Sequence, residues 1–543
     1  MRVPLSWLRD FAPVEGDPRD VGETLDDLGL VVEDIERVGE GLEGVVVARV
    51  LAIDPIPRAD QIRLVTVDAG DGRSLEVVCG ASNFSVGDLV PLATVGTVLP
   101  GGMAVSRRKM KGVESNGMLC SGSELGLSDD AAGILVVGSG LDEDGLAAEP
   151  GTPLIDALGI EPDVVFNLEI EGNRPDALSI AGVARDLAAR LGLPFSIPDP
   201  QPVEAEVPTE RLARATVEAP DLCPRLLVRA LVDVTVGASP SWVARRLVLA
   251  GMRPINSVVD ASNYVMLELG QPTHPYDLDR LGGQGLLVRR ARSGETIVTL
   301  DGEERRLGVP VGDVEADDCL ICDAEGSPVG IAGIMGGGTS EITASTSRVL
   351  LEVANFRPMA IARTSARLGL RTEASVRFER GADPEALDRA GARVCELVGG
   401  VGGTTASGSL DVRGKLVPPL VVRLRTDRVN AILGTDLDDE TVRQHLTPLG
   451  FEVSPEGPRV QQVRVPSFRP DTTREIDVIE EVARLHGYSR MPRTVPPPPG
   501  VGQLTPYQRH RRRVREVLAG IGANEAWTAS LLAPGDHEAA GLN

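Results

Sequence analysis

Residues 44–138 alternate between short apolar runs and turn-forming residues. The runs are VVVARVLAIDPI, IRLVTVDAG, SLEVVCGA, LVPLATVGTVL and GILVVG, separated by Gly, Asp and Pro. Apolar runs of this length bounded by turn signals predict β-strands. Five or six short strands within about 100 residues indicate a small barrel or sandwich.

Helical spacing follows after residue 150. Apolar side chains recur at Ile180, Val183, Leu187 and Leu191. Pro175 before this segment and Gly192 after it are typical start and stop signals of a helix. Further along, β-type runs fill 285–356, and a helical segment that dissolves into glycine near 402 predicts a domain boundary near 405.

The sequence pattern changes twice in the last part of the chain. Residues 417–492 alternate strand, helix, strand, strand and helix, and the run TVPPPPGVG predicts a stiff linker. A final helix carries Val514, Val517, Leu518 and Ile521 on one face. Because such a helix cannot bury its apolar face alone, the sequence is expected to end inside a domain.

These patterns predict a multidomain chain that mixes α/β and α+β architecture. Its predicted segments are residues 1–40 with 151–200, 41–150, 206–405, 415–492, the linker 493–505, and 506–543.

Composition narrows the class of protein. With 42% hydrophobic residues the chain is typical of globular rather than disordered proteins. No apolar run is long enough for a membrane span and the N-terminus lacks a signal-peptide pattern, so we expect a cytoplasmic protein without a membrane partner. Lys and Arg number 55 against 79 Asp and Glu, a net charge of −24, which disfavours a nucleic-acid footprint over the whole surface. Six cysteines are too few for a disulfide framework.

An acidic cluster precedes the proline run. Asp477, Glu480 and Glu481 share one face if their segment is helical, and Asp471 lies just before it. Hard oxygen ligands on one face suit Mg²⁺. The spacing alone favours the simpler interpretation, that these acids stabilise the start of a helix.

A second group of polar residues falls in the middle segment. His274 lies between Pro272 and Pro275, which indicates a rigid loop. Ser262 and Asn263 precede it, and Glu352 interrupts the apolar strand VLLEVANF, an unusual place for a carboxylate. From the residues alone, this pattern favours a hydrogen-bonded structural histidine and an edge glutamate over a reactive pocket.

Four segments carry a family resemblance. They are PRADQIRLVTVDAG through KGVESNGMLCSGSELGL, then RPINSVVDASNYVMLELGQPTHPYDLDRL, then GIAGIMGG through RTEASVRFERG, and VPSFRPDTTREIDVIEEVARLHGYSRMP. In this order they resemble the beta subunit of bacterial phenylalanyl-tRNA synthetase over essentially the whole chain. The family continues beyond the point where this sequence stops.

The resemblance implies an identity for each segment. Residues 41–150 would be an OB-fold tRNA-binding domain inserted in an N-terminal α/β module, 206–405 an editing domain, and 506–543 the start of a class II synthetase-like, catalytic-like domain. The family assembles two alpha and two beta subunits that join phenylalanine to tRNA(Phe) with ATP and Mg²⁺. The partners implied are the alpha subunit and tRNA(Phe), with no DNA.

The resemblance also assigns roles in editing, the hydrolysis of tyrosine wrongly attached to tRNA(Phe). Glu352 would accept the tyrosine hydroxyl, and Ser262, Asn263 and His274 would position the ester and water. Ala332 and Gly333 would wall the amino-acid pocket. The implied Mg²⁺ ligands, shared with the alpha subunit, are Asp471, Asp477, Glu480 and Glu481. Two other functions stay open: a stand-alone deacylase of mischarged tRNA, and a non-catalytic tRNA-binding protein.

Overall fold

The computed structural model describes residues 1–57, 59–70, 72, 74–127, 131–137, 149–159, 161–310, 316–492, 502–528 and 530–542. The chain divides into two compact units, Met1–Met491 and Pro492–Asn543.

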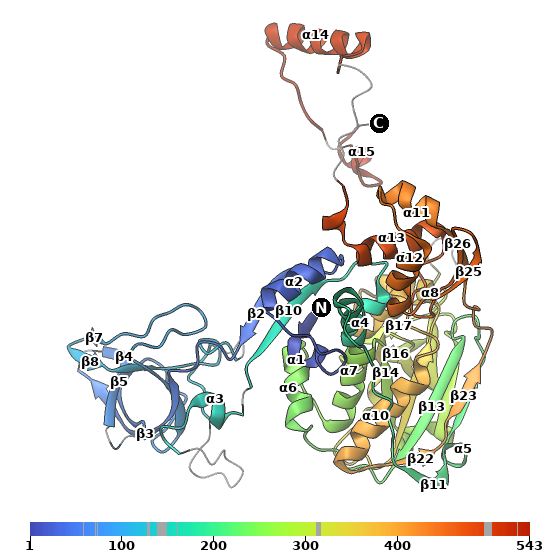
Figure 1. The fold of residues 1–543 in the computed structure, drawn as a ribbon. Coiled ribbons are helices and arrows are strands. Elements are labelled where there is room, and N and C mark those ends of the chain that lie inside the picture. The colour runs from blue at the N-terminus through green and yellow to red at the C-terminus, as the bar shows by residue number, and fades with distance from the viewer. Residues whose placement is uncertain are drawn as a thin grey trace. The chain divides into compact units, whose positions relative to one another are not determined.

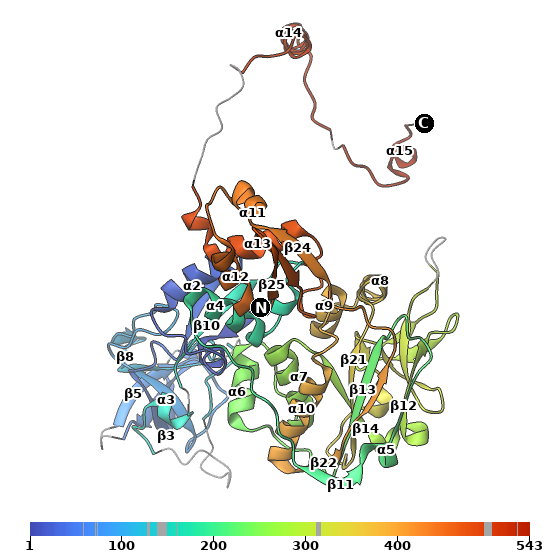
Figure 2. The same cartoon turned by 45° about the vertical axis from the view of Figure 1, so that its right-hand side comes forward.

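The middle of the first unit is a layered domain with a mixed sheet at its centre (Figures 1 and 2). This sheet has the order β11-β22-β13-β21-β14, and β23 also pairs with β13. The bounds are β11 Glu204–Pro208, β13 Arg225–Val232, β14 Thr273–Asp277, β21 Val349–Asn355, β22 Thr404–Ser407 and β23 Leu410–Arg413.

The two faces of the central sheet are both covered. On one face, Leu351 and Val353 of β21 share a core with helices α7 (Ser257–Leu269) and α10 (Leu387–Gly402). On the other, Leu350 and Ala354 share a core with a second sheet. Since successive side chains of a strand alternate in direction, Glu352 faces the second sheet.

The second sheet has the order β12-β15-β18-β19-β20. Its bounds are β12 Arg214–Val217, β15 Gly285–Arg290, β18 Cys319–Asp323, β19 Pro328–Ile331 and β20 Met335–Gly336, beside a hairpin of β16 (Thr296–Val298) and β17 (Glu304–Arg306). The remaining helices of the domain are α5 (Thr209–Leu212), α6 (Ser241–Leu249), α8 (Pro358–Leu368) and α9 (Glu373–Arg380).

The central sheet extends the domain beyond the boundary near 405 that the glycine-rich segment predicted. Gly402 has a φ of +112°, a conformation that favours glycine. The chain turns there, and both β22 and β23 then pair with β13. The glycines end a helix inside the domain, and the sheet continues to Arg413.

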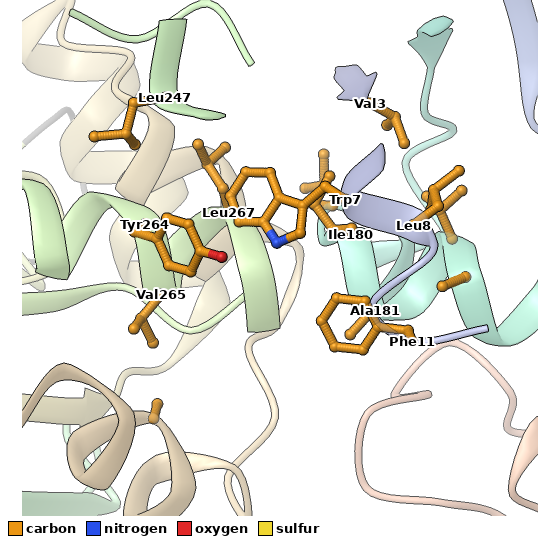
Figure 3. Close-up of a cluster of buried hydrophobic side chains, with 14 of the residues drawn as sticks. Val3, Trp7, Leu8, Phe11, Ile180, Ala181, Leu247, Tyr264, Val265 and Leu267 are labelled. Carbon is orange, nitrogen blue, oxygen red and sulfur yellow. The ribbon is translucent and has the colours of Figure 1, made fainter. Parts of the chain in front are cut away.

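The N-terminal module joins two distant segments. Strand β10 (Asp163–Glu169) pairs with both β1 (Arg2–Pro4) and β2 (Val31–Val38). The predicted helix with Ile180 and Leu191 is present as α4 (Ile180–Leu191), with α1 (Leu5–Leu8), α2 (Pro18–Asp27) and α3 (Leu154–Ala157) in addition. Trp7 stacks on Tyr264 of α7 at 4.5 Å between ring centroids, in a core shared with the middle domain (Figure 3).

The inserted domain contains a five-stranded antiparallel sheet of order β5-β4-β3-β6-β9. Its bounds are β3 Val45–Ile56, β4 Ala59–Asp68, β5 Ser74–Cys79, β6 Leu89–Thr94 and β9 Gly117–Leu119, with a hairpin of β7 (Arg108–Met110) and β8 (Val113–Ser115). The strand predicted from GILVVG is wrong for its described residues, 133–137, which lie outside the strands. The Asn83 side chain bonds the backbone N–H and C=O of Ile134, so a side chain takes the place of a strand partner there.

The small domain that ends the first unit has the sheet order β24-β26-β25 and three helices. The bounds are β24 Val421–Arg425, α11 Thr426–Leu433, α12 Asp439–Leu446, β25 Glu452–Gly457, β26 Val460–Arg464 and α13 Glu475–His486. In the second unit the predicted helix is α14 (Pro506–Gly520), followed by α15 (Asp536–Ala539), and the apolar side chains of α14 are exposed. Most of the predicted linker lies outside the described residues. Among the described helices, none combines the length and apolar character that a membrane span requires.

Candidate functional site

Glu352 is a buried carboxylate in the middle of a sheet. Its neighbours in register are Val228 of β13 and His274 of β14. Only 6% of its surface is exposed. A carboxylate in such a position is costly unless a polar partner or a ligand compensates it.

Tyr276 supplies that partner from the same sheet face. Its phenol donates a hydrogen bond of 2.8 Å to Glu352 Oε2. Burial raises the pKa of Glu352 to about 7, although the hydrogen bond from Tyr276 opposes the rise. Within the described residues no hydrogen bond reaches the second oxygen, Oε1.

His274 lies beside this pair. Its ring centroid is 4.5 Å from that of Tyr276, and burial lowers the pKa of His274 to about 4. The imidazole is therefore neutral at physiological pH and can exchange hydrogen bonds without carrying charge. Gly336 of β20 lies against it, since a Cβ there would come within 2.6 Å of the ring.

Ser262 and Asn263 belong to α7, on the helix side of the sheet. The Ser262 hydroxyl lies 2.7 Å from both the carbonyl and the hydroxyl oxygen of Thr273, so it ties α7 to β14. Thr273 alternates with His274 and its side chain lies on the opposite face. The structure brings His274 and Glu352 together but leaves Ser262 behind the strand. Asn263 is half-buried, and its side chain has no hydrogen bond within the described residues.

Ala332 and Gly333 form a turn after β19. Gly333 has a φ of +67°, and a Cβ on it would lie 2.9 Å from Phe378 and 3.0 Å from Phe356. Ala332 is 1% exposed, and its N–H donates to the carbonyl of Cys319. Both residues thus pack against the apolar core beside the Glu352 group, which consists of Glu352, Tyr276 and His274.

Sequence reasoning missed two members of the site, Tyr276 and Gly330. Tyr276 follows His274 by two residues, and in a strand that spacing places two side chains on one face. Gly330 pairs in register with Gly336, and a Cβ on Gly330 would come within 3.2 Å of the Tyr276 hydroxyl. The predicted loop around His274 is instead β14, which is why the two-residue period was overlooked.

The pKa of Glu352 predicts a pH-dependent gain in stability from Glu352→Gln. Since the folded pKa lies above the ordinary value of 4.5, the folded state holds the proton more tightly, and stability falls as pH rises from about 4.5 to 7. An amide removes that cost and still accepts from Tyr276. We expect the variant to be more stable by about 3 kcal/mol at pH 8.

Thermal melts at two pH values test this prediction. At pH 8 Glu352→Gln should melt at a higher temperature than the wild type, and at pH 5 the difference should largely vanish. A lower melting temperature for the variant at pH 8 would show that the buried charge is compensated.

The acidic cluster at α13 forms part of a buried ion-pair network. Arg469 is bound by Asp471 at 2.7 Å and by Glu481 at 2.8 Å. Glu481 also binds Arg484 at 2.6 Å, and Arg484 pairs with Asp186 of α4. Its other members are Arg174, Asp176 and Arg185, so the network joins the small domain to the N-terminal module.

The expected common face of Asp477, Glu480 and Glu481 is corrected by this arrangement. Glu481 is 1% exposed, because it turns inward to the two arginines. Asp477 accepts from the backbone N–H groups of Thr473 and Arg474, as a residue that stabilises a helix start does. Glu480 is exposed.

The four carboxylates do not fit a Mg²⁺ ion in this arrangement. Three of them already accept hydrogen bonds from arginine or backbone groups. Among the described residues, no three acidic, histidine or cysteine side chains gather closely enough to hold a metal. The magnesium site stays a prediction that rests on the resemblance.

A cavity of about 950 Å³ lies away from Glu352. It is lined by α4, the connector 199–204, α10 and residues 467–468. Its ionisable lining includes both arginines and carboxylates, among them Arg229, Arg389, Asp383 and Asp388.

Known protein families match three parts of the chain. A tRNA binding domain model matches residues 45–142, the B3/4 domain matches 222–403, and the tRNA synthetase B5 domain matches 422–488. The B3/4 match contains the Glu352 group, and the B5 match contains the acidic cluster.

Whole-chain relatives share one description. The phenylalanine–tRNA ligase beta subunit of Anaeromyxobacter dehalogenans is 44% identical over 546 residues, which cover 99% of this chain and 65% of that protein. That of Geobacter sulfurreducens is 44% identical over 540 residues, covering 98% of this chain and 65% of that protein. Over nearly its whole length the chain is similar to phenylalanine–tRNA ligase beta subunits.

The match does not cover the full length of these curated relatives, because this chain spans 65% of their length. A solved N-terminal fragment of the phenylalanyl-tRNA synthetase beta-subunit from Pyrococcus horikoshii is 18% identical and covers 60% of this chain and 88% of its own. Its TM-score of 0.34 is too low to support an argument.

Proposed function

We propose that this chain acts as a beta subunit of phenylalanine–tRNA ligase and hydrolyses Tyr-tRNA(Phe). The single observation that supports editing is the buried Glu352 with one bound and one free oxygen. A pocket built for phenylalanine cannot strongly reject tyrosine, which only adds a hydroxyl. A second site that selects for that hydroxyl solves the problem.

Selection follows from the cost of burying an unpaired charge. The phenol O–H of a tyrosyl group would donate to Glu352 Oε1. A phenylalanyl group would leave Glu352 Oε1 desolvated and without a hydrogen-bond donor, and an unpaired buried polar atom costs free energy. Glu352 thus discriminates against the correct product and spares it from hydrolysis.

The hydrolysis itself would use a positioned water. The water oxygen bonds to the ester carbonyl carbon, the bond to the ribose oxygen breaks, and tyrosine and tRNA(Phe) leave. A covalent route finds no support, because the Ser262 hydroxyl bonds Thr273 rather than a histidine. All six cysteines are buried, and none of them forms a disulfide. Neutral His274 is suited to orient the water by hydrogen bonding, with Asn263 assigned to the ester by the resemblance.

The wider activity belongs to an assembly. We propose that the chain partners with the alpha subunit, in the family's heterotetramer, to attach phenylalanine to tRNA(Phe) with ATP and Mg²⁺ in the cytoplasm. The tRNA binding domain match supports contact with tRNA. Adenylate formation would belong to the alpha subunit.

The test is hydrolysis of Tyr-tRNA(Phe) and Phe-tRNA(Phe) by the purified chain, alone and with the alpha subunit. Preferential hydrolysis of Tyr-tRNA(Phe) by the chain alone shows that the editing site is complete without the alpha subunit. Activity that appears only with the alpha subunit supports the assembled synthetase. Binding of tRNA without hydrolysis in either sample would support a non-catalytic tRNA-binding protein.

A further inference from the structure

The proposed editing site contains a phenol of its own. Tyr276 is 1% exposed, and its hydroxyl lies 2.8 Å from Glu352 Oε2. A substrate tyrosine would bring a second phenol to the same carboxylate. The two phenols need not compete, since each can occupy a different oxygen.

The phenol of Tyr276 lies between the central sheet and the second sheet. Tyr276 and Glu352 lie on neighbouring strands of one sheet. Gly330 of the second sheet lies close to this phenol, since a Cβ on Gly330 would lie 3.2 Å from the hydroxyl. A side chain at position 330 would crowd the hydroxyl, and glycine there leaves it room beside Glu352.

We propose that Tyr276 is a positioning residue of the editing site. Its phenol holds Glu352 Oε2, so that Oε1 alone faces the hydroxyl of the misattached tyrosine. The proposal rests on the proposed editing function and adds a residue that sets its selectivity.

Two consequences follow from the hydrogen bond. It fixes the rotation of the carboxyl group, so that Oε1 is pre-aligned for an incoming donor. It also favours the ionised form of Glu352, because a hydrogen bond to a carboxylate is stronger than one to a neutral carboxyl. Only the ionised form accepts at both oxygens.

Glu352 is the group around the site that titrates near neutral pH. Burial raises the pKa of Glu352 to about 7, partly offset by Tyr276, whereas burial lowers that of His274 to about 4. The other titratable groups that face it are the thiols of Cys223 and Cys319, and burial raises the pKa of both. Val228 of β13 carries no charge.

The experiment measures kcat/KM for Tyr-tRNA(Phe) hydrolysis against pH for Tyr276→Phe. We expect the rising limb of the profile to move up by about one pH unit, with about tenfold lower kcat/KM on its acid side and a smaller loss at high pH, where only the alignment of Oε1 is missing. A 3-fluorotyrosine at position 276, whose phenol is a stronger donor, should move the profile in the opposite direction.

Tyr264→Phe is the matched control. Tyr264 is a buried tyrosine whose hydroxyl bonds Arg246 at 2.7 Å, away from Glu352. Its profile should coincide with that of the wild type. Superimposable profiles for wild type and Tyr276→Phe, with the wild type active, would overturn the role of Tyr276 and leave the editing function standing. A wild type inactive with and without the alpha subunit would overturn both.

Discussion

Glu352→Ala is expected to lower kcat/KM for hydrolysis of Tyr-tRNA(Phe) by about 100-fold or more. Glu352 is the buried group with an oxygen free for the tyrosine hydroxyl. Sites built to bond a substrate hydroxyl lose selectivity of this size or larger when the pairing is lost. The same change should leave binding of uncharged tRNA(Phe) nearly unchanged, because Glu352 lies in the B3/4 match and outside the tRNA binding domain match.

Steady-state deacylation with Tyr-tRNA(Phe) and a filter-binding assay with uncharged tRNA(Phe) measure these two quantities. Glu268→Gln is the control, because Glu268 is another buried glutamate of the same domain and pairs with Arg393 instead. Its hydrolysis should remain close to that of the wild type. Equal hydrolysis by Glu352→Ala and the wild type would remove Glu352 from substrate recognition.

Arg469→Ala is expected to cost about 3–5 kcal/mol of stability. Arg469 is 3% exposed and binds Asp471 and Glu481. Its loss leaves buried carboxylates without their main partner, the situation in which a broken ion pair is most destabilising. Because the network reaches Asp186 of the N-terminal module, the small domain and the module should lose stability together.

The network also predicts acid sensitivity. Burial alone would raise the pKa of Asp186, but Arg174 and Arg484 lower it to about 2. Burial opposes the lowering of the pKa of Glu481 in the same way, and Arg484 and Arg469 overcome it. A lowered folded pKa gives stability that is present above the ordinary value near 4 and is lost as pH falls toward 2. The wild type should therefore lose much of its advantage over Arg469→Ala in that window.

Thermal and denaturant melts from pH 7 to pH 2 follow this loss. Arg474→Ala is the matched control, because Arg474 pairs with Asp477 through an exposed side chain, and exposed pairs contribute about 0–1 kcal/mol. If the Arg469→Ala variant melts at the same temperature as the Arg474→Ala variant, the network adds little stability. Addition of Mg²⁺ to the chain alone should not move the melt of the wild type, since its carboxylates already have partners.

The regular elements of this fold could be predicted from local patterns. The helix over 180–191 and the strands from 285 to 356 follow from periodicity and from their Gly and Pro boundaries. The end of the middle domain could not, because β22 and β23 pair with β13 across nearly 180 residues of sequence. Likewise GILVVG has the composition of a strand, but the hydrogen bonds of its backbone are divided among the Asn83 side chain, Cys120 and Leu89 instead of going to one partner strand.

The candidate site shows the same division. Glu352 was conspicuous in the sequence because a carboxylate interrupts an apolar strand, and the structure places it beside His274. Tyr276 was not, since a tyrosine beside a histidine signals nothing until sheet pairing brings both to Glu352. Glu481 was misplaced for a related reason, because helical spacing assigned it to one face with Asp477 and Glu480, whereas in the structure it is buried and binds Arg469 and Arg484.

The most direct test of the account is a crystal structure of the chain with an amide-linked, non-hydrolysable analogue of tyrosine attached to the terminal adenosine of tRNA. The account predicts the tyrosyl hydroxyl within hydrogen-bond distance of Glu352 Oε1, with Tyr276 still bound to Oε2 and His274 near the amide. A tyrosyl group bound elsewhere, for example in the cavity lined by α4 and α10, with Glu352 untouched, would contradict it.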